Sequence, residues 1–270
     1  MDYPVEMKPY VHDQMRYVTG AGVAQDFKVE HRNFNIDKHP ELTPIIINNF
    51  NRIEYLKRAI DAMKSRGYEN IYIIDNASTY EPLLKYYRAE GLRVFYLDQN
   101  VGYLSIWRTK IQHNFIHNHY IYTDSDIEPV EECPADFVTH FKGLLDRYRD
   151  ARKVGFGLKI DDLPEHYSLR RQVIEHERQF HVQRLGPGIF SSPIDTTLAL
   201  YRPTVVGGWW LPAIRTGDPY VARHLPWYAD SANPTEEDLY YQSTSTALTH
   251  WTQLGDEDTP SALGGQQLGA

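Results

Sequence analysis

The sequence predicts a single α/β domain in which a mostly parallel sheet is flanked by helices. Short apolar runs alternate with segments whose apolar residues recur every three or four positions. This alternation is typical of βαβ units and a parallel sheet. A length of 270 residues suits one large domain of this class.

The first predicted strand lies in "TPIIINNFNR", which begins at Thr43 and ends in an asparagine-rich exit loop. A helix should follow, because apolar residues recur at spacings of three, four and three. Its apolar positions are Ile53, Leu56, Ile60 and Met63. Gly67 is a typical residue to end it.

Three more strands and two more helices complete the first half. The strands are predicted in "NIYIIDNAST", "RVFYLDQNVG" and "YIYTDSD". A short helix is expected over 82–90, ended by Gly91. The next helix is predicted from an apolar series at spacings of three, four and four: Leu104, Trp107, Ile111 and Phe115.

The second half is less regular. Helices are expected over 136–148 and 167–180, and strands in "KVGFGLKI" and "IDTTLALYRP". "GGWWLP" is typical of a tight aromatic turn. Residues 1–42 show no period and are taken as an N-terminal extension, and 255–270 as a flexible tail.

The composition narrows the classes of partner and the cellular setting that fit this protein. The net charge of −8 disfavours nucleic acid as a partner, because nucleic-acid binding needs a basic face. Cys133 is the single cysteine, so no internal disulfide can form, and a reducing cytoplasmic setting fits. The start has no apolar core of a signal peptide and no run is long enough to span a bilayer, so a membrane-bound acceptor would be met by peripheral contact.

Polar clusters follow the four predicted strands of the first half. They occupy 48–51, 75–79, 100–102 and 124–126. Ligands of parallel sheets bind at the carboxyl ends of the strands, so these clusters predict one binding edge.

Two of these clusters carry carboxylates. Asp124 and Asp126 are separated by one residue, so both side chains could face one cation, and Mg²⁺ and Mn²⁺ prefer such oxygen ligands. The alternative is a solvated acidic turn.

Asp75 has two possible roles at the end of its strand. It could accept hydrogen bonds from a base or a ribose, or it could serve only as a helix cap or Asx turn.

The quoted strand segments "TPIIINNFNR", "YIIDNAST", "DQNVG" and "YIYTDSD" resemble, in order and spacing, the nucleotide-binding half of family 2 glycosyltransferases of the GT-A fold. The resemblance covers roughly 43–130. It implies a nucleotide-sugar donor and a Mn²⁺ or Mg²⁺ ion, and it makes 131–254 the acceptor-binding half. Asp126 would be the main metal ligand and Asp124 would lie near the ribose and the metal.

The resemblance also implies a set of donor-binding residues. Arg108 stands where the family often has an Ala-Arg-Asn segment, and it could face the diphosphate. The expected set is Asn49, Asn51, Arg52, Asp75, Asn100, Gly102, Arg108 and Asp124.

Candidates in the second half are less specific. Asp195, Glu237 and Asp238 are the candidate general bases, although an acidic pair after Pro234 also suits the first turn of a helix. His224 could complete the metal shell. Trp209 and Trp227 could stack on an acceptor sugar.

These expectations favour a metal-dependent glycosyltransferase that acts on a glycan or lipid-linked glycan, with inversion if attack is direct. One alternative is a sugar-nucleotide nucleotidyltransferase, which should carry a Gly-rich loop that "NNFNR" lacks. The other is a non-catalytic nucleotide-sugar-binding protein.

Overall fold

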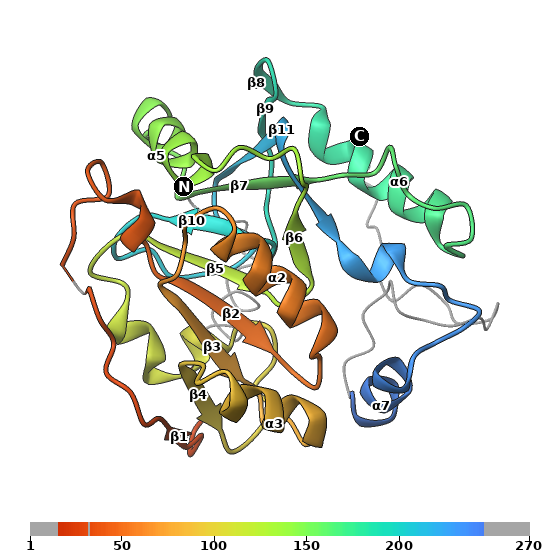
Figure 1. Ribbon diagram of the computed structural model, residues 1–270. Coiled ribbons are helices and arrows are strands. Elements are labelled where there is room, and N and C mark those ends of the chain that lie inside the picture. Colours follow the sequence, from red (N-terminus) through yellow and green to blue (C-terminus); the bar gives the residue numbers. More distant parts are fainter. Residues whose placement is uncertain (1–15, 32, 246–270) are drawn as a thin grey trace.

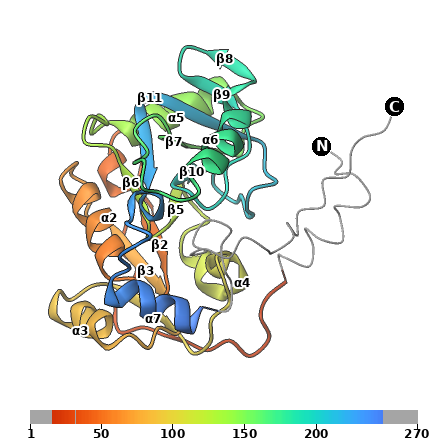
Figure 2. The same cartoon turned by 90° about the vertical axis from the view of Figure 1, so that its right-hand side faces the viewer.

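The computed structural model describes residues 16–31 and 33–245 (Figures 1 and 2). Within these residues one sheet runs in the order β1-β4-β3-β2-β5-β10-β7-β11-β9-β8, and β6 pairs with β11. The predicted single α/β domain, with parallel strands at its centre and flanking helices, is confirmed. The predicted tail, 255–270, lies outside the described residues.

The strands are β1 Val23–Ala24, β2 Ile45–Asn49, β3 Ile71–Asp75, β4 Val94–Leu97, β5 Tyr120–Asp124, β6 Ile127–Pro129, β7 Lys153–Leu158, β8 Arg184–Gly186, β9 Ile189–Ser191, β10 Ala199–Tyr201 and β11 Ala213–His224. The α-helices are α2 Glu54–Lys64, α3 Glu81–Ala89, α4 Ser105–Arg108, α5 Phe137–Arg147, α6 Arg170–Arg178 and α7 Glu236–Thr244. The 3₁₀ turns are η1 Pro40–Leu42, η2 Lys110–Asn114, η3 Gln179–His181 and η4 Leu225–Tyr228.

The four strands β4, β3, β2 and β5 are parallel to one another, as the alternation of elements predicts. The second half is mixed: β10 runs antiparallel to both β5 and β7, whereas β7 and β11 are parallel. β1, from the predicted N-terminal extension, adds an antiparallel edge strand beside β4.

Alternate residues of the central strands fill two cores, one on each face of the sheet. Ile45 and Ile47 of β2 pack with the core beneath α2, whereas Ile46 packs with the core on the opposite face, beside α4. Figure 2 shows α2 and α3 on one side of the sheet and α4 on the other. A two-residue period in buried strands explains why both faces are apolar.

The helix predicted over 104–115 is wrong in part. α4 ends at Arg108, and Thr109 is extended (φ −123°, ψ 170°) before the 3₁₀ turn η2. The Thr109 hydroxyl donates to the Ser105 carbonyl at 2.9 Å and accepts from the Ile111 amide at 3.4 Å. Such local bonds from a threonine compete with helix hydrogen bonds, and the apolar spacing alone does not reveal them.

No helix in the described part of the chain combines the length and the apolarity needed to cross a membrane.

Candidate donor and metal site at the carboxyl edge of the sheet

The strand register brings the polar clusters of the sequence to one edge. Asn49 lies opposite Asp75 across β2 and β3, and Asn48 lies opposite Asp124 across β2 and β5. The Asn48 side chain donates to Asp124 Oδ1 at 3.2 Å and accepts from the Ser105 hydroxyl at 2.7 Å. The predicted convergence at this edge therefore exists for β2, β3 and β5.

Asp124 is held from both sides at the end of β5. Its Oδ1 accepts from Asn48 and its Oδ2 accepts from the Thr196 hydroxyl. The Asp124 amide also donates to the Thr196 carbonyl at 2.9 Å. Burial, together with the negative charge of Asp126, raises the pKa of Asp124 well above its usual range. A nearby cation would favour its ionised form.

Asp126 faces His224. Asp126 lies in the turn between β5 and β6, and the antiparallel pairing of β6 with β11 places His224 opposite Ile127. Asp126 Oδ2 is 3.3 Å from His224 Nε2, and the Asp126 carbonyl accepts from the Leu225 amide at 2.8 Å. Burial opposes ionisation of Asp126, but the charges of His224 and Arg52 outweigh it and lower its pKa.

Two atoms of this pair lack partners. Asp126 Oδ1 and His224 Nδ1 are buried and accept or donate no hydrogen bond. The side chains are nevertheless 25% and 16% exposed, so a ligand can approach them. Asp126 supplies an oxygen ligand of the kind that Mn²⁺ and Mg²⁺ both prefer, and the His224 imidazole is a nitrogen ligand that suits Mn²⁺ better than Mg²⁺.

The described side chains alone do not form a complete shell for a cation. Among the residues that the structure describes, no three His, Cys, Asp or Glu side chains gather closely enough to hold an ion. Cis ligands of an octahedral ion at about 2.1 Å lie roughly 3 Å apart, close to the spacing of Asp126 and His224. Mg²⁺ commonly takes one or two protein ligands and completes its shell with water and substrate phosphates, so the residues present fit such an ion.

Asp75 is engaged within the protein. Its Oδ1 accepts from the Ser78 amide and its Oδ2 from the Tyr87 hydroxyl, both at 2.9 Å. The side chain is buried, and this burial raises its pKa. Asn49 donates to the same Tyr87 hydroxyl at 2.8 Å. The hydrogen bond from Ser78 belongs to a turn, which the sequence analysis gave as the alternative to base binding by Asp75.

Asn51 organises the loops rather than standing free. Its backbone adopts φ +51°, and its Oδ1 accepts from the amides of Thr79 and Tyr80 at 2.8 and 3.0 Å. Its Nδ2 donates to the Thr244 hydroxyl of α7 at 2.9 Å. Asn51 therefore ties the exit loops of β2 and β3 to α7.

The 100–102 loop is also internally bonded. Asn100 Oδ1 accepts from the Gly102 amide at 2.8 Å, and Gly102 adopts φ +82°, which favours glycine. The Arg108 guanidinium donates to the Val101 carbonyl at 2.8 Å. Arg108 thus braces this loop at the predicted donor edge.

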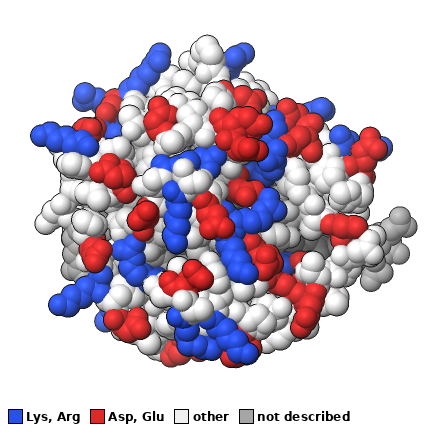
Figure 3. Space-filling view, in the orientation of Figure 1, with Lys and Arg blue, Asp and Glu red and all other residues white. Residues whose placement is uncertain are grey.

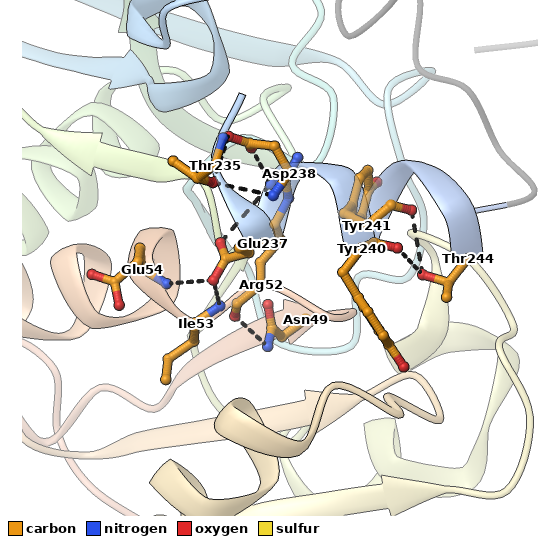
Figure 4. Close-up of polar contacts among 10 residues, drawn as sticks. All are labelled: Asn49, Arg52, Ile53, Glu54, Thr235, Glu237, Asp238, Tyr240, Tyr241 and Thr244. Carbon is orange, nitrogen blue, oxygen red and sulfur yellow. Dashed lines mark hydrogen bonds and ion pairs between the residues drawn. The ribbon is translucent and has the colours of Figure 1, made fainter. Parts of the chain in front are cut away.

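Helix α7 lies across the same edge and is anchored by its acidic first turn (Figure 4). Glu237 Oε2 accepts from the amides of Ile53 and Glu54 at 2.8 and 3.1 Å, so it caps α2. Asp238 pairs with Arg52 at 2.5 Å and forms a capping box with Thr235. Glu237 and Asp238 therefore lie in the first turn of a helix, which was the alternative to a catalytic role. The carboxylates of both residues are already engaged in contacts that hold α7 in place.

Asp195 differs from these two acids because its side chain is exposed. It was expected at the entrance of a strand, but β10 begins only at Ala199, and Asp195 lies in the preceding loop. The next residue, Thr196, holds Asp124, so Asp195 stands beside the strand edge. Its charge also contributes to the raised pKa of Asp124.

The two candidate sugar-stacking tryptophans are largely enclosed. Trp227 is 2% exposed and packs in the core, with its ring centroid 4.7 Å from that of His224. Trp209 is partly buried, edge-on to Trp210 at 6.2 Å. Of the two, Trp209 alone offers surface to an acceptor.

Sequence reasoning missed several residues that build this edge. Thr196 holds Asp124, Tyr87 holds Asp75, and Ser105 orders Asn48. Thr196 follows the candidate Asp195 directly, and this adjacency was an available signal. Tyr87 and Ser105 belong to helices with no local pattern that marks them.

No described protein family and no curated protein match this sequence. A crystal structure of S. aureus TarS is similar in fold, with a TM-score of 0.41 and 12% identity. The similarity covers 67% of this chain and 36% of that one, so the chain matches about a third of the length of TarS. A superposition this loose carries no conclusion about activity.

Proposed function

We propose that this protein is a metal-dependent glycosyltransferase that moves a sugar from a nucleotide-sugar donor to a hydroxyl of a glycan or lipid-linked glycan. The observation that carries the proposal is the contact between Asp126 and His224, two residues beyond Asp124 at the end of β5, where Thr196 holds Asp124 next to the exposed Asp195. The resemblance of the four strand segments to family 2 glycosyltransferases of the GT-A fold supports it.

Asp126 and His224 would hold the ion, Mn²⁺ or Mg²⁺, with Asp124 beside them. The ion would supply charge neutralisation for the diphosphate as it leaves. The orphaned Asp126 Oδ1 supports this assignment, because a buried polar atom without a partner is costly unless a ligand uses it.

The nucleotide would lie along the exits of β2 and β3, over Asn49, Asn51 and Asp75. Since α7 contacts these loops through Thr244 and Asp238, a bound nucleotide would lie against α7 or displace it. Arg108, which braces the 100–102 loop, would face the phosphates.

Asp195 would accept the proton of the acceptor hydroxyl. The acceptor oxygen attacks the anomeric carbon, the bond to the diphosphate oxygen breaks with its electron pair on the leaving group, and the proton goes to the Asp195 carboxylate. Attack from the face opposite the diphosphate inverts the anomeric centre. Exposure favours Asp195 over Glu237 and Asp238, because a base must reach a substrate.

The setting remains the one that the sequence favours, a cytoplasmic enzyme that meets a membrane-linked acceptor by peripheral contact. On the face drawn in Figure 3, acidic and basic side chains are interspersed among the described residues. That face therefore does not present a broad basic surface of the kind that nucleic acid requires.

The test is a screen of nucleotide sugars against the full-length protein. A productive donor should raise the melting temperature more with Mn²⁺ than without it, and with an acceptor it should release nucleoside diphosphate. EDTA should stop the release. Release of pyrophosphate from a sugar phosphate and a nucleoside triphosphate would identify a nucleotidyltransferase instead, and donor binding without turnover of any acceptor would identify a non-catalytic binder.

A further inference from the structure

Lys153 carries a fully buried ammonium group in the middle of the sheet. It begins β7, between β10 and β11, and its side chain is 0% exposed. Its Nζ donates to the carbonyls of Ile194 at 2.6 Å and Asp195 at 3.2 Å, and to the Tyr201 hydroxyl at 3.1 Å. A buried cation is tolerated when its donors are satisfied, and here two of its three acceptors belong to one loop.

A second buried cation holds the same loop one residue earlier. Arg215 on β11 is 4% exposed, and its Nε donates to the Pro193 carbonyl at 2.7 Å. Its Nη1 pairs with Glu177 of α6 at 2.8 Å. Three consecutive carbonyls, from Pro193 to Asp195, therefore accept hydrogen bonds from two cations on adjacent strands.

The far end of this loop is fastened to the candidate site. The Thr196 carbonyl and hydroxyl bond to Asp124, and the Leu198 amide donates to the Thr123 hydroxyl at 3.2 Å. Loop carbonyls that face the interior need partners, and the regular ladder of the sheet does not supply them between β9 and β10. Lys153 and Arg215 supply them, while the Asp195 side chain stays exposed.

We infer that Lys153 and Arg215 are positioning residues, which clamp the 193–195 backbone so that the Asp195 carboxylate is held beside Asp124. The inference rests on the proposed function, in which Asp195 accepts the proton of the acceptor. Neither cation touches the substrate; both act through the loop. Charge-assisted bonds to carbonyls suit this task, because they are stronger than neutral ones.

The experiment compares Lys153→Met and Arg215→Lys with Val154→Ala. Methionine fills the space of the lysine stem without the donors, and lysine at 215 keeps the charge but loses the two-direction geometry of the guanidinium. Val154 is a fully buried residue next to Lys153, so Val154→Ala matches a loss of core stability without removing a bond to the loop.

The first readout is hydrogen exchange of residues 192–198, which does not depend on activity. We expect exchange there to be about tenfold or more faster in Lys153→Met and Arg215→Lys than in Val154→Ala, with other strands alike. Equal exchange in the three variants would overturn the inference. If Lys153→Met does not fold, Arg215→Lys carries the comparison.

The second readout is turnover. We expect kcat to fall in both clamp variants while the KM for the donor stays at the wild-type value, because the clamp affects the base and not the donor edge. Faster exchange with an unchanged kcat would show that Lys153 and Arg215 hold the loop, but that Asp195 is not the general base. If the wild-type protein turns over no donor, the proposed function fails and the exchange readout alone decides whether the clamp exists.

Discussion

Asp126 Oδ2 lies 3.3 Å from His224 Nε2, and each side chain also has a buried atom without a hydrogen-bond partner. The two residues are almost 100 positions apart in the sequence and are joined by the pairing of β6 with β11. A carboxylate and an imidazole at this spacing form either an ion pair or two ligands of a shared cation. The two roles predict different responses to metal.

Replacing Asp126 by Asn or His224 by Ala should weaken Mn²⁺ binding at least about tenfold, because each change removes a ligand. Calorimetry in the presence of a nucleoside diphosphate measures it. Glu128→Gln is the matched control, since it removes a nearby acidic charge that pairs instead with Arg58 at 2.6 Å. Equal Mn²⁺ affinity in all three variants would reduce the Asp126–His224 contact to an ion pair.

The three candidate bases should separate in kinetics. Asp195→Asn should lower kcat by ~10²–10⁴-fold with donor KM unchanged, which is the usual range for a positioned base. Glu237→Gln should instead lower the melting temperature, because it weakens the cap on α2, and should change kcat far less.

Asp238→Asn should likewise act on stability, through the pair with Arg52. A larger kcat loss in Glu237→Gln than in Asp195→Asn would move the base to α7. Proton NMR of the fresh product tests the stereochemistry: retention of the donor's anomeric configuration would exclude a single displacement.

Asp75 and Tyr87 offer a way to separate base recognition from turn formation. Asp75→Asn is nearly isosteric and can still accept from the Ser78 amide, but it loses the charge. We expect it to weaken binding of a nucleoside diphosphate in the absence of metal. Tyr87→Phe should lower stability by about 1.5–3 kcal/mol, the range for a hydrogen bond to a charged group, and leave nucleotide affinity equal or higher.

Tyr87→Phe frees Asp75 Oδ2 for a ligand, whereas Asp75→Asn removes the negative charge that a base or ribose would meet. Isothermal titration of both variants with free nucleotide gives the comparison. If Asp75→Asn binds as well as the wild type, then Asp75 serves the turn alone.

The edge of the sheet could be predicted because its signals are local. Apolar runs that end at Asp75 and Asp124 specify buried strands with polar exits, and parallel pairing then aligns those exits. The break of the predicted helix at Thr109 follows from a side chain bonding to its own backbone, which apolar spacing does not encode.

The packing of α7 and of the 193–195 loop around that edge could not be predicted, because it depends on contacts between residues far apart in the sequence. Glu237 caps a helix that begins 183 residues earlier in the chain, and no local pattern identifies its partner. Lys153 was missed for a similar reason. A lysine at the start of a strand reads as a solvent-facing residue, and its acceptors are backbone carbonyls that any sequence could provide.

Lys153 also makes the stability of the protein depend on pH in a definite direction. Burial lowers its pKa from 10.5 to about 7, although the charge of Asp195 opposes the shift. Below about pH 7 Lys153 is the cation that holds the 193–195 loop. Between pH 7 and 10.5 the unfolded chain binds a proton that the folded chain has released, so the free energy of unfolding rises with pH. Below about 7 both states are protonated and the contribution is flat. At pH 7 half of the folded molecules have released the proton, so the slope grows towards about 1.4 kcal/mol per unit and the increase from pH 7 to 8.5 is roughly 1.5 kcal/mol from this group.

Urea unfolding at the two pH values measures this increase. Lys153→Met should lack it, whereas Lys142→Met, which alters a lysine paired with the exposed Asp146, should retain it. A wild-type protein and a Lys153→Met variant with the same pH dependence would show that the ammonium stays charged in the folded protein throughout this range.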